Sequence, residues 1–101
     1  MAGRVTELLT DEDVVARLLD LPDWKRAAGG ESAIAATYKF ADFAEALAFV
    51  NAVGAEAEAV DHHPDIDIRW NKVTLVLSTH SAGGLTAKDF GLAKTISGLP
   101  R

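Results

Sequence analysis

The side chains best suited to move protons in this chain are three histidines, and all three fall in one stretch of the sequence. His62 and His63 are adjacent, and His80 follows after a run of alternating hydrophobic residues. The chain contains no cysteine, which excludes disulfides, thiolate nucleophiles and thiolate metal sites. Histidine titrates near neutral pH, so a pair in a partly open pocket can offer one protonated and one neutral ring. Such a pair would supply an acid and a base to one small molecule.

A predicted β-hairpin over residues 65–80 should bring the histidines together. Hydrophobic residues alternate with polar ones on both sides of a predicted two-residue turn, Asn71-Lys72, a pattern typical of a hairpin. With Trp70 and Val73 as the closing pair, His63 lies directly opposite His80. Directly opposed residues have Cβ atoms about 4.5 to 5.5 Å apart. We therefore expect these two imidazoles to reach the same ligand.

Charged residues at two helix ends should complete this pocket. Thr86 is the predicted N-cap of a helix that begins shortly after His80, with Lys88 and Asp89 in its first turn. The positive end of that helix is expected to face the histidines. Glu58 can approach from the end of the preceding helix.

Two other interpretations of these residues compete with catalysis. A single histidine is usually structural or simply exposed, although three that converge favour a common role. Three imidazoles can also hold zinc. However, His62 and His63 are adjacent, so in a strand they would point to opposite faces, whereas paired metal ligands commonly share a face. This spacing disfavours a metal site. Trp24 could be either a core residue or a stacking surface.

The elements that position these residues can be predicted from helix caps and hydrophobic periodicity. Thr10, Asp42 and Thr86 are predicted N-caps, the second with Glu45 three residues later as in a capping box. The predicted elements are a helix from Thr10 to near Pro22, a strand over residues 33–40, a helix from Asp42 to about Ala59, the hairpin, and a helix from Thr86 to Gly98 and Pro100. Residues 25–31, with their Gly29-Gly30 pair, are predicted to form a loop. Helices and strands do not alternate, so we expect an α+β fold with helices on one face of an antiparallel sheet.

The bulk properties set outer limits on function. With 101 residues, 49% of them hydrophobic and 25% charged, residues 1–101 should form a single globular domain. No hydrophobic stretch is long enough to cross a membrane, and the first residues lack the hydrophobic region of a secretory signal. We therefore expect a cytoplasmic protein without membrane contact. The net charge of -5 argues against binding to nucleic acid.

The ordered motifs of residues 61–93, DHHPDIDIRWNKVTLVLSTHSAGGLTAKDFGLA, resemble the signature of the pterin-4a-carbinolamine dehydratases, also called dimerisation cofactors. The resemblance extends through Trp24 and the segment FADFAEALAFVNAV and covers residues 19–96. It implies a four-stranded antiparallel sheet with three helices on one face. It also implies a homodimer or a homotetramer of that unit.

The resemblance further implies a reaction. Pterin-4a-carbinolamine, released by an aromatic amino acid hydroxylase, would lose water to give the quinonoid dihydropterin during tetrahydrobiopterin recycling, without a metal or an organic cofactor. By this similarity His62 and His80 are the general acid and base, and His63 binds and orients the pterin. The resemblance assigns further substrate-binding positions to Glu58, Pro64, Ser78, Thr79, Lys88 and Asp89.

One of these positions differs from the family pattern. Animal members carry arginine where this chain has Lys88. Lysine keeps the positive charge but lacks the planar guanidinium group, which can form two parallel hydrogen bonds with one ligand. The competing function is a non-catalytic pterin-binding or protein-interaction module, because animal members also stabilise a dimeric homeodomain transcription factor. The complete set of histidines favours the enzyme.

Overall fold

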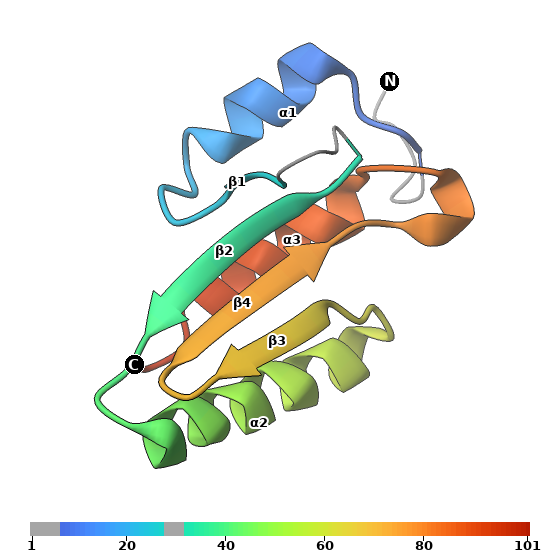
Figure 1. The fold of residues 1–101 in the computed structure, drawn as a ribbon. Helices are drawn as coiled ribbons and strands as arrows, with labels where there is room; N and C mark the ends of the chain where they lie inside the picture. The colour runs from blue at the N-terminus through green and yellow to red at the C-terminus, as the bar shows by residue number, and fades with distance from the viewer. Residues whose placement is uncertain (1–6, 28–31) are drawn as a thin grey trace.

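Four strands of the chain form one antiparallel sheet in the order β1-β2-β4-β3 (Figure 1). The computed structural model describes residues 7–27 and 32–101. The elements are α1 (Asp11–Leu18), β1 (Lys25–Arg26), β2 (Ile34–Lys39), α2 (Phe43–Val60), β3 (Asp65–Arg69), β4 (Lys72–Leu77), the short 3-10 helix η1 (His80–Ala82) and α3 (Ala87–Ser97). The predicted α+β class is confirmed. None of the described helices is both long enough and apolar enough to span a membrane.

The core lies on one face of the sheet. Burial alternates along β2 and β4, as expected where one face of an antiparallel sheet packs and the other meets water. The buried strand residues are Ile34, Ala36, Tyr38, Val73, Leu75 and Leu77. The three helices contribute to the core on this face, with α3 behind β2 and β4, α2 along β3 and α1 along the β1 side (Figure 1). Trp24 is a core residue, because it is 4% exposed and its Nε1 donates to Ser97 Oγ at 3.1 Å.

All three predicted helix starts are confirmed. Thr10 Oγ1 accepts from the Asp13 amide at 3.1 Å, and Asp42 Oδ1 accepts from the Glu45 amide at 2.9 Å. A complete capping box, reciprocal between Thr86 and Asp89, begins α3. These side chains satisfy amides that the helix itself leaves unpaired.

The predicted loop over residues 25–31 is wrong in its first part. Lys25 and Arg26 form a short edge strand that pairs with Ala35 and Ile34. A two-residue strand is too short to show hydrophobic alternation, and charged residues are common on sheet edges because they discourage pairing with other chains. The Gly29-Gly30 pair lies outside the described residues.

The predicted hairpin is present, but its turn is at Trp70-Asn71 and not at Asn71-Lys72. Arg69 pairs with Lys72, which displaces every cross-strand pair by two residues from the predicted register. Hydrophobic alternation cannot detect this error, because a shift of two keeps each side chain on its face. Contacts with the residue that follows β2 favour the observed turn: the Asn71 side chain donates to Phe40 O at 2.8 Å, and the Phe40 amide donates to Asn71 O at 2.8 Å.

Candidate active site

The first two histidines follow the C-terminal end of α2. Asp61 caps the helix in the left-handed conformation, with φ 50, which reverses the direction of the chain. The His62 amide then donates to Ala57 O at 3.1 Å, so His62 folds back against the last turn of α2. Burial follows from this position, and the His62 side chain is only 11% exposed.

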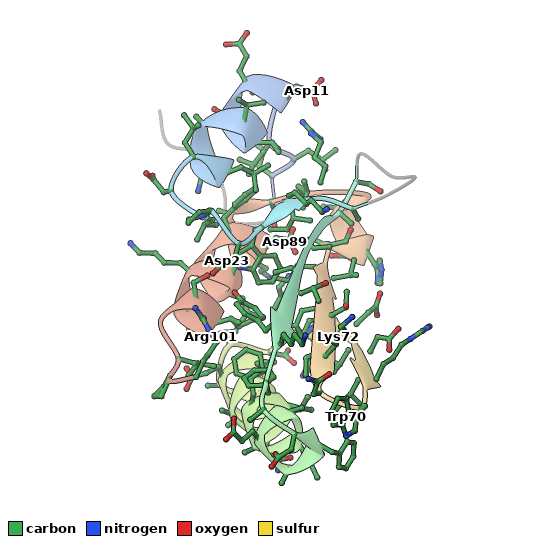
Figure 2. The ribbon with its side chains drawn as sticks, turned by 60° about the vertical axis from the view of Figure 1, so that its left-hand side comes forward. Asp11, Asp23, Trp70, Lys72, Asp89 and Arg101 are labelled. Atoms are coloured by element: carbon green, nitrogen blue, oxygen red, sulfur yellow. The ribbon has the colours of Figure 1, made fainter. Side chains whose placement is uncertain are left out.

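His62 is held by a buried carboxylate from α3. Its Nε2 lies 2.7 Å from Asp89 Oδ1, and the Asp89 side chain is fully buried. Figure 2 shows Asp89 in the interior of the molecule. A charge at such a site is costly unless it is paired and hydrogen-bonded. Asp89 meets this requirement through its second oxygen as well.

The second carboxylate oxygen belongs to a chain of hydrogen bonds. Asp89 Oδ2 accepts from the Thr86 amide at 2.9 Å and from the Thr79 hydroxyl at 2.8 Å. The Thr79 and Thr86 hydroxyl oxygens lie 2.8 Å apart, and Thr86 Oγ1 accepts from the Lys88 amide at 3.2 Å. A hydroxyl has one proton to donate. Because Thr79 donates its proton to Asp89, Thr86 donates to Thr79.

This network determines which nitrogen of His62 is available for chemistry. An ionised carboxylate only accepts hydrogen bonds, so His62 Nε2 carries the proton that Asp89 accepts. In the neutral ring the lone pair is then on Nδ1. Asp89 thus selects the tautomer of His62 and stabilises the imidazolium that forms if Nδ1 takes up a proton.

His63 belongs to a separate and more exposed pair. Its Nε2 lies 3.1 Å from Glu58 Oε1, with the two side chains 53% and 78% exposed. Glu58 and His63 lie on either side of the left-handed turn at Asp61, which brings them together. Such an exposed pair holds its members weakly, so His63 can reorient toward a ligand.

His80 does not lie opposite His63, contrary to the predicted register. The β3–β4 ladder ends at Asp65 and Val76, so neither histidine is in it. His80 begins η1, is exposed, and forms no side-chain hydrogen bond with any residue in the described ranges. It directly follows Thr79, whose hydroxyl contacts Asp89. The structure therefore joins His62, Thr79 and Asp89 in one network and His63 with Glu58 in another, while His80 is linked to the first network through the backbone.

The remaining predicted positions surround these two groups. Pro64 is half-buried just before β3, and Ser78 Oγ donates to Ser32 O at 2.7 Å. Lys88 lines a cavity of about 160 Å³ beside His62. The sequence identified Thr86 only as a helix cap and missed its hydroxyl as part of the network that holds His62. Its pairing with Asp89 in the capping box was the signal that could have indicated this role.

No group of three histidine or acidic side chains within residues 7–27 and 32–101 is arranged to hold a metal ion. The Asp89 carboxylate instead uses both oxygens on protein donors. The arrangement is suited to general acid-base chemistry, with one oriented histidine and two more exposed ones nearby.

Comparison with solved structures relates this fold to proteins of known architecture. A transcriptional coactivator/pterin dehydratase from Brucella melitensis superposes with a TM-score of 0.83 and 34% identity, covering 88% of this chain and 94% of that one. A pterin dehydratase-like protein described as a RuBisCO assembly factor in the alpha-carboxysome shares the fold, with a TM-score of 0.60, 21% identity and coverage of 73% and 84%.

Sequence comparison relates nearly the whole chain to one family. A protein from Nocardia farcinica is 53% identical over 96 residues, covering 95% of this chain and 98% of its own. A protein from Roseiflexus castenholzii is 56% identical over 89 residues, covering 88% and 92%. Both carry the name pterin-4-alpha-carbinolamine dehydratase as a provisional assignment. The profile of the family described as pterin 4 alpha carbinolamine dehydratase matches residues 7–99. On these matches and on its fold, the chain belongs to the pterin 4 alpha carbinolamine dehydratase family.

Proposed function

We propose that the protein is a 4a-hydroxytetrahydrobiopterin dehydratase, a hydro-lyase that eliminates water from pterin-4a-carbinolamine to give the quinonoid dihydropterin. The observation that carries this proposal is the buried Asp89 that orients His62 at 2.7 Å within a chain of this family. Within residues 7–27 and 32–101, the only side-chain hydrogen bond of His62 is the one from Nε2 to Asp89, which leaves an oriented Nδ1. A general base needs such an available and oriented nitrogen.

The elimination requires two proton transfers. The proton on N5 of the pterin leaves, the N5 electron pair forms the new C=N bond to C4a, and the C4a–O bond breaks as the hydroxyl is protonated and departs as water. We assign N5 deprotonation to His62 Nδ1, because Asp89 stabilises the resulting imidazolium. His80, exposed beside Thr79, is assigned as the acid that protonates the hydroxyl. One proton passes from base to acid after each turnover, so no net proton is consumed.

Binding is assigned to the residues around these two histidines. His63, paired with Glu58, would orient the pterin, and Pro64, Ser78 and Thr79 would line its site. Lys88, which borders the cavity beside His62, would contribute a point charge. No metal or organic cofactor is needed, since positioned acid-base groups each contribute about 10²- to 10⁴-fold.

The proposed setting is tetrahydrobiopterin recycling in the cytoplasm, after an aromatic amino acid hydroxylase, in a homodimer or homotetramer. Large apolar side chains exposed on α2 and on the hairpin support the oligomer. They are Phe43, Leu47, Val60 and Ile66. Such clusters commonly mark interfaces between protein chains.

A stopped-flow assay tests the activity directly. Carbinolamine is generated in the mixing cell, and its decay is followed with and without the protein, in the presence and absence of a chelator. We expect decay to accelerate in proportion to protein concentration and to be unaffected by chelation. Decay at the spontaneous rate would contradict the proposal, and activity that is lost on chelation and restored by zinc would indicate a metal enzyme.

The alternative is a non-catalytic pterin-binding or protein-interaction module. The exposed apolar residues of α2 and the hairpin favour it, because an interaction surface would also present them. Pterin binding without accelerated decay would support the module.

A further inference from the structure

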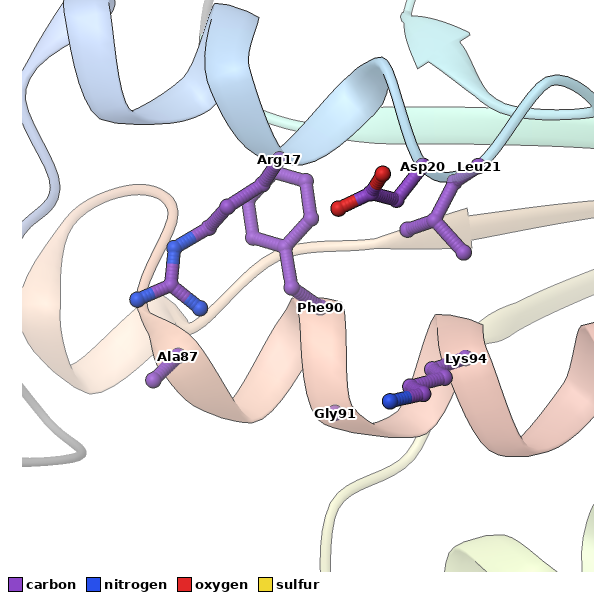
Figure 3. A pocket seen from close by; sticks show the side chains of 7 residues that line it. All are labelled: Arg17, Asp20, Leu21, Ala87, Phe90, Gly91 and Lys94. Carbon is purple, nitrogen blue, oxygen red and sulfur yellow. The ribbon is translucent and has the colours of Figure 1, made fainter.

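A cleft separates α1 from α3 on the part of the molecule shown in Figure 3. Its volume is about 350 Å³. Leu21 and Phe90, both nearly fully buried, contribute apolar side chains to its wall. An aromatic ring and a branched aliphatic side chain form a surface on which a flat apolar group can pack.

Charged side chains surround this apolar surface. Arg17 and Asp20 extend from α1 and the turn after it, and Lys94 extends from α3 toward the same space (Figure 3). The Arg17 guanidinium lies 5.9 Å from the centre of the Phe90 ring. Within the described parts of the chain, neither Arg17 nor Lys94 forms an ion pair. A chain with a net charge of -5 thus places two cations without ion-pair partners around one cavity.

A glycine opens the α3 side of the cleft. Gly91 lies within α3, where glycine weakens a helix relative to alanine. A Cβ built on Gly91 would have no atom within 4 Å, so packing inside the protein does not require glycine there. The missing side chain instead allows a bound group to approach the helix backbone between Phe90 and Lys94.

We propose that the α1–α3 cleft is a binding site for a small aromatic monocarboxylate. The Arg17 guanidinium group binds the carboxylate through two parallel hydrogen bonds, and Lys94 adds the second positive charge. The aromatic body packs on Phe90 and Leu21 and passes over Gly91. Asp20 limits the total negative charge of the ligand, because a second anionic group would face its carboxylate. Gly91 also lines the cavity beside His62, but none of the assigned catalytic histidines lines this cleft, and the proposed binding does not depend on the dehydratase reaction.

The test is an amide NMR titration of the full chain with 3-phenylpropionate, compared with 3-phenylpropanamide, which has the same shape without the charge. We expect saturable shifts centred on Arg17, Gly91 and Lys94, with a dissociation constant of about 1 mM, as is usual for a ligand of this size. The amide should bind at least about fivefold more weakly, since a charged acceptor makes the stronger hydrogen bond.

Three variants and a matched control locate the site. Arg17→Gln and Lys94→Gln should each weaken binding of 3-phenylpropionate at least about threefold. Gly91→Leu should abolish binding, because the leucine side chain would fill the space beside α3 that the ligand occupies. Lys39→Gln removes another exposed cation, from β2, and should leave binding unchanged. Gly91→Ala provides a smaller obstruction if the leucine variant fails to fold. Shifts that do not saturate, equal affinity for the amide, or equal effects of Lys39→Gln and Lys94→Gln would each overturn the proposal.

Discussion

Asp89 connects the start of α3 with the histidine assigned as the base. One carboxylate oxygen caps the helix and the other holds His62 Nε2. The helix cap thereby fixes the orientation of the His62 ring. A change at this carboxylate should therefore affect stability and catalysis by different routes, which can be separated experimentally.

Asp89→Asn should reverse the tautomer of His62. The amide oxygen can still accept from Thr86 and Thr79, but the amide nitrogen then faces His62 Nε2 and donates to it, so the ring proton moves to Nδ1. We expect the dehydration rate to fall at least about tenfold. Stopped-flow assays measure the rate, and ring ¹⁵N shifts report the tautomer.

Asp61→Asn is the matched control for this substitution. Asp61 is also acidic and lies next to His62 in sequence, but its side chain is exposed. Its backbone adopts the left-handed conformation, which asparagine also accepts. It should keep the wild-type rate and the wild-type tautomer. An Asp89→Asn variant with normal activity and a reversed tautomer would disprove the assignment of His62 as base.

The three histidines should differ in what their replacement changes. His80→Gln should lower kcat at least about tenfold with little change in pterin affinity, because glutamine keeps polarity but cannot titrate. His63→Gln should mainly raise the dissociation constant for the pterin. Single-turnover kinetics separate binding from chemistry. If all three single glutamine variants remain folded and dehydrate at the wild-type rate, the enzymatic assignment fails.

At the level of elements, the start of α3 should be more sensitive to substitution than the start of α1. Thr86 is fully buried and its hydroxyl takes part in two hydrogen bonds, whereas the Thr10 cap is exposed. Thr86→Ala should lower the free energy of unfolding by about 2–3 kcal/mol, and Thr10→Ala by about 1 kcal/mol. Urea denaturation followed by circular dichroism measures both. Equal losses would mean that the buried network adds no stability beyond an ordinary cap.

The hairpin turn contains a strained residue. Trp70 adopts φ 51 and is 67% exposed at the tip of the β3–β4 hairpin (Figure 2). A left-handed residue costs roughly 1–2 kcal/mol unless it is glycine or asparagine. Trp70→Asn should therefore raise the free energy of unfolding by about 1 kcal/mol. Trp70→Ala keeps the backbone cost and should bring no gain; a gain from alanine as large as that from asparagine would refute the explanation by strain.

At the scale of the whole molecule, the exposed apolar residues should determine assembly. Leu47 on α2 and Ile66 on β3 are 42% and 40% exposed, on elements that contact each other. We expect an oligomer at micromolar concentration and a smaller species for Leu47→Glu, because a buried unpaired charge is costly. Light scattering measures the mass. Leu19→Glu, at an 80% exposed position directly after α1, is the matched control and should leave the mass unchanged.

Much of the fold follows from short-range signals. The caps at Thr10, Asp42 and Thr86 each bind a backbone amide three residues away or less, so local sequence was sufficient to predict the helix starts. The alternation along β2 and β4 likewise predicted the buried face, because side chains in a strand alternate at a period of two. The residue pattern alone indicated the three histidines, Glu58, Lys88 and Asp89, and the family resemblance added Pro64, Ser78 and Thr79. The structure joins His62 and Thr79 to Asp89, and His63 to Glu58.

The hairpin register and the hydrogen-bond network were decided by tertiary structure. A shift of two residues preserves hydrophobic alternation, so the sequence could not distinguish the predicted turn from the observed one. The choice follows from Asn71 bonding to Phe40, which is distant in sequence. The role of Thr86 also depends on contacts that form only when β4, α3 and the end of α2 meet around Asp89. Local patterns determine which residues can cap or face the core, whereas hydrogen bonds between distant segments determine which of them surround His62.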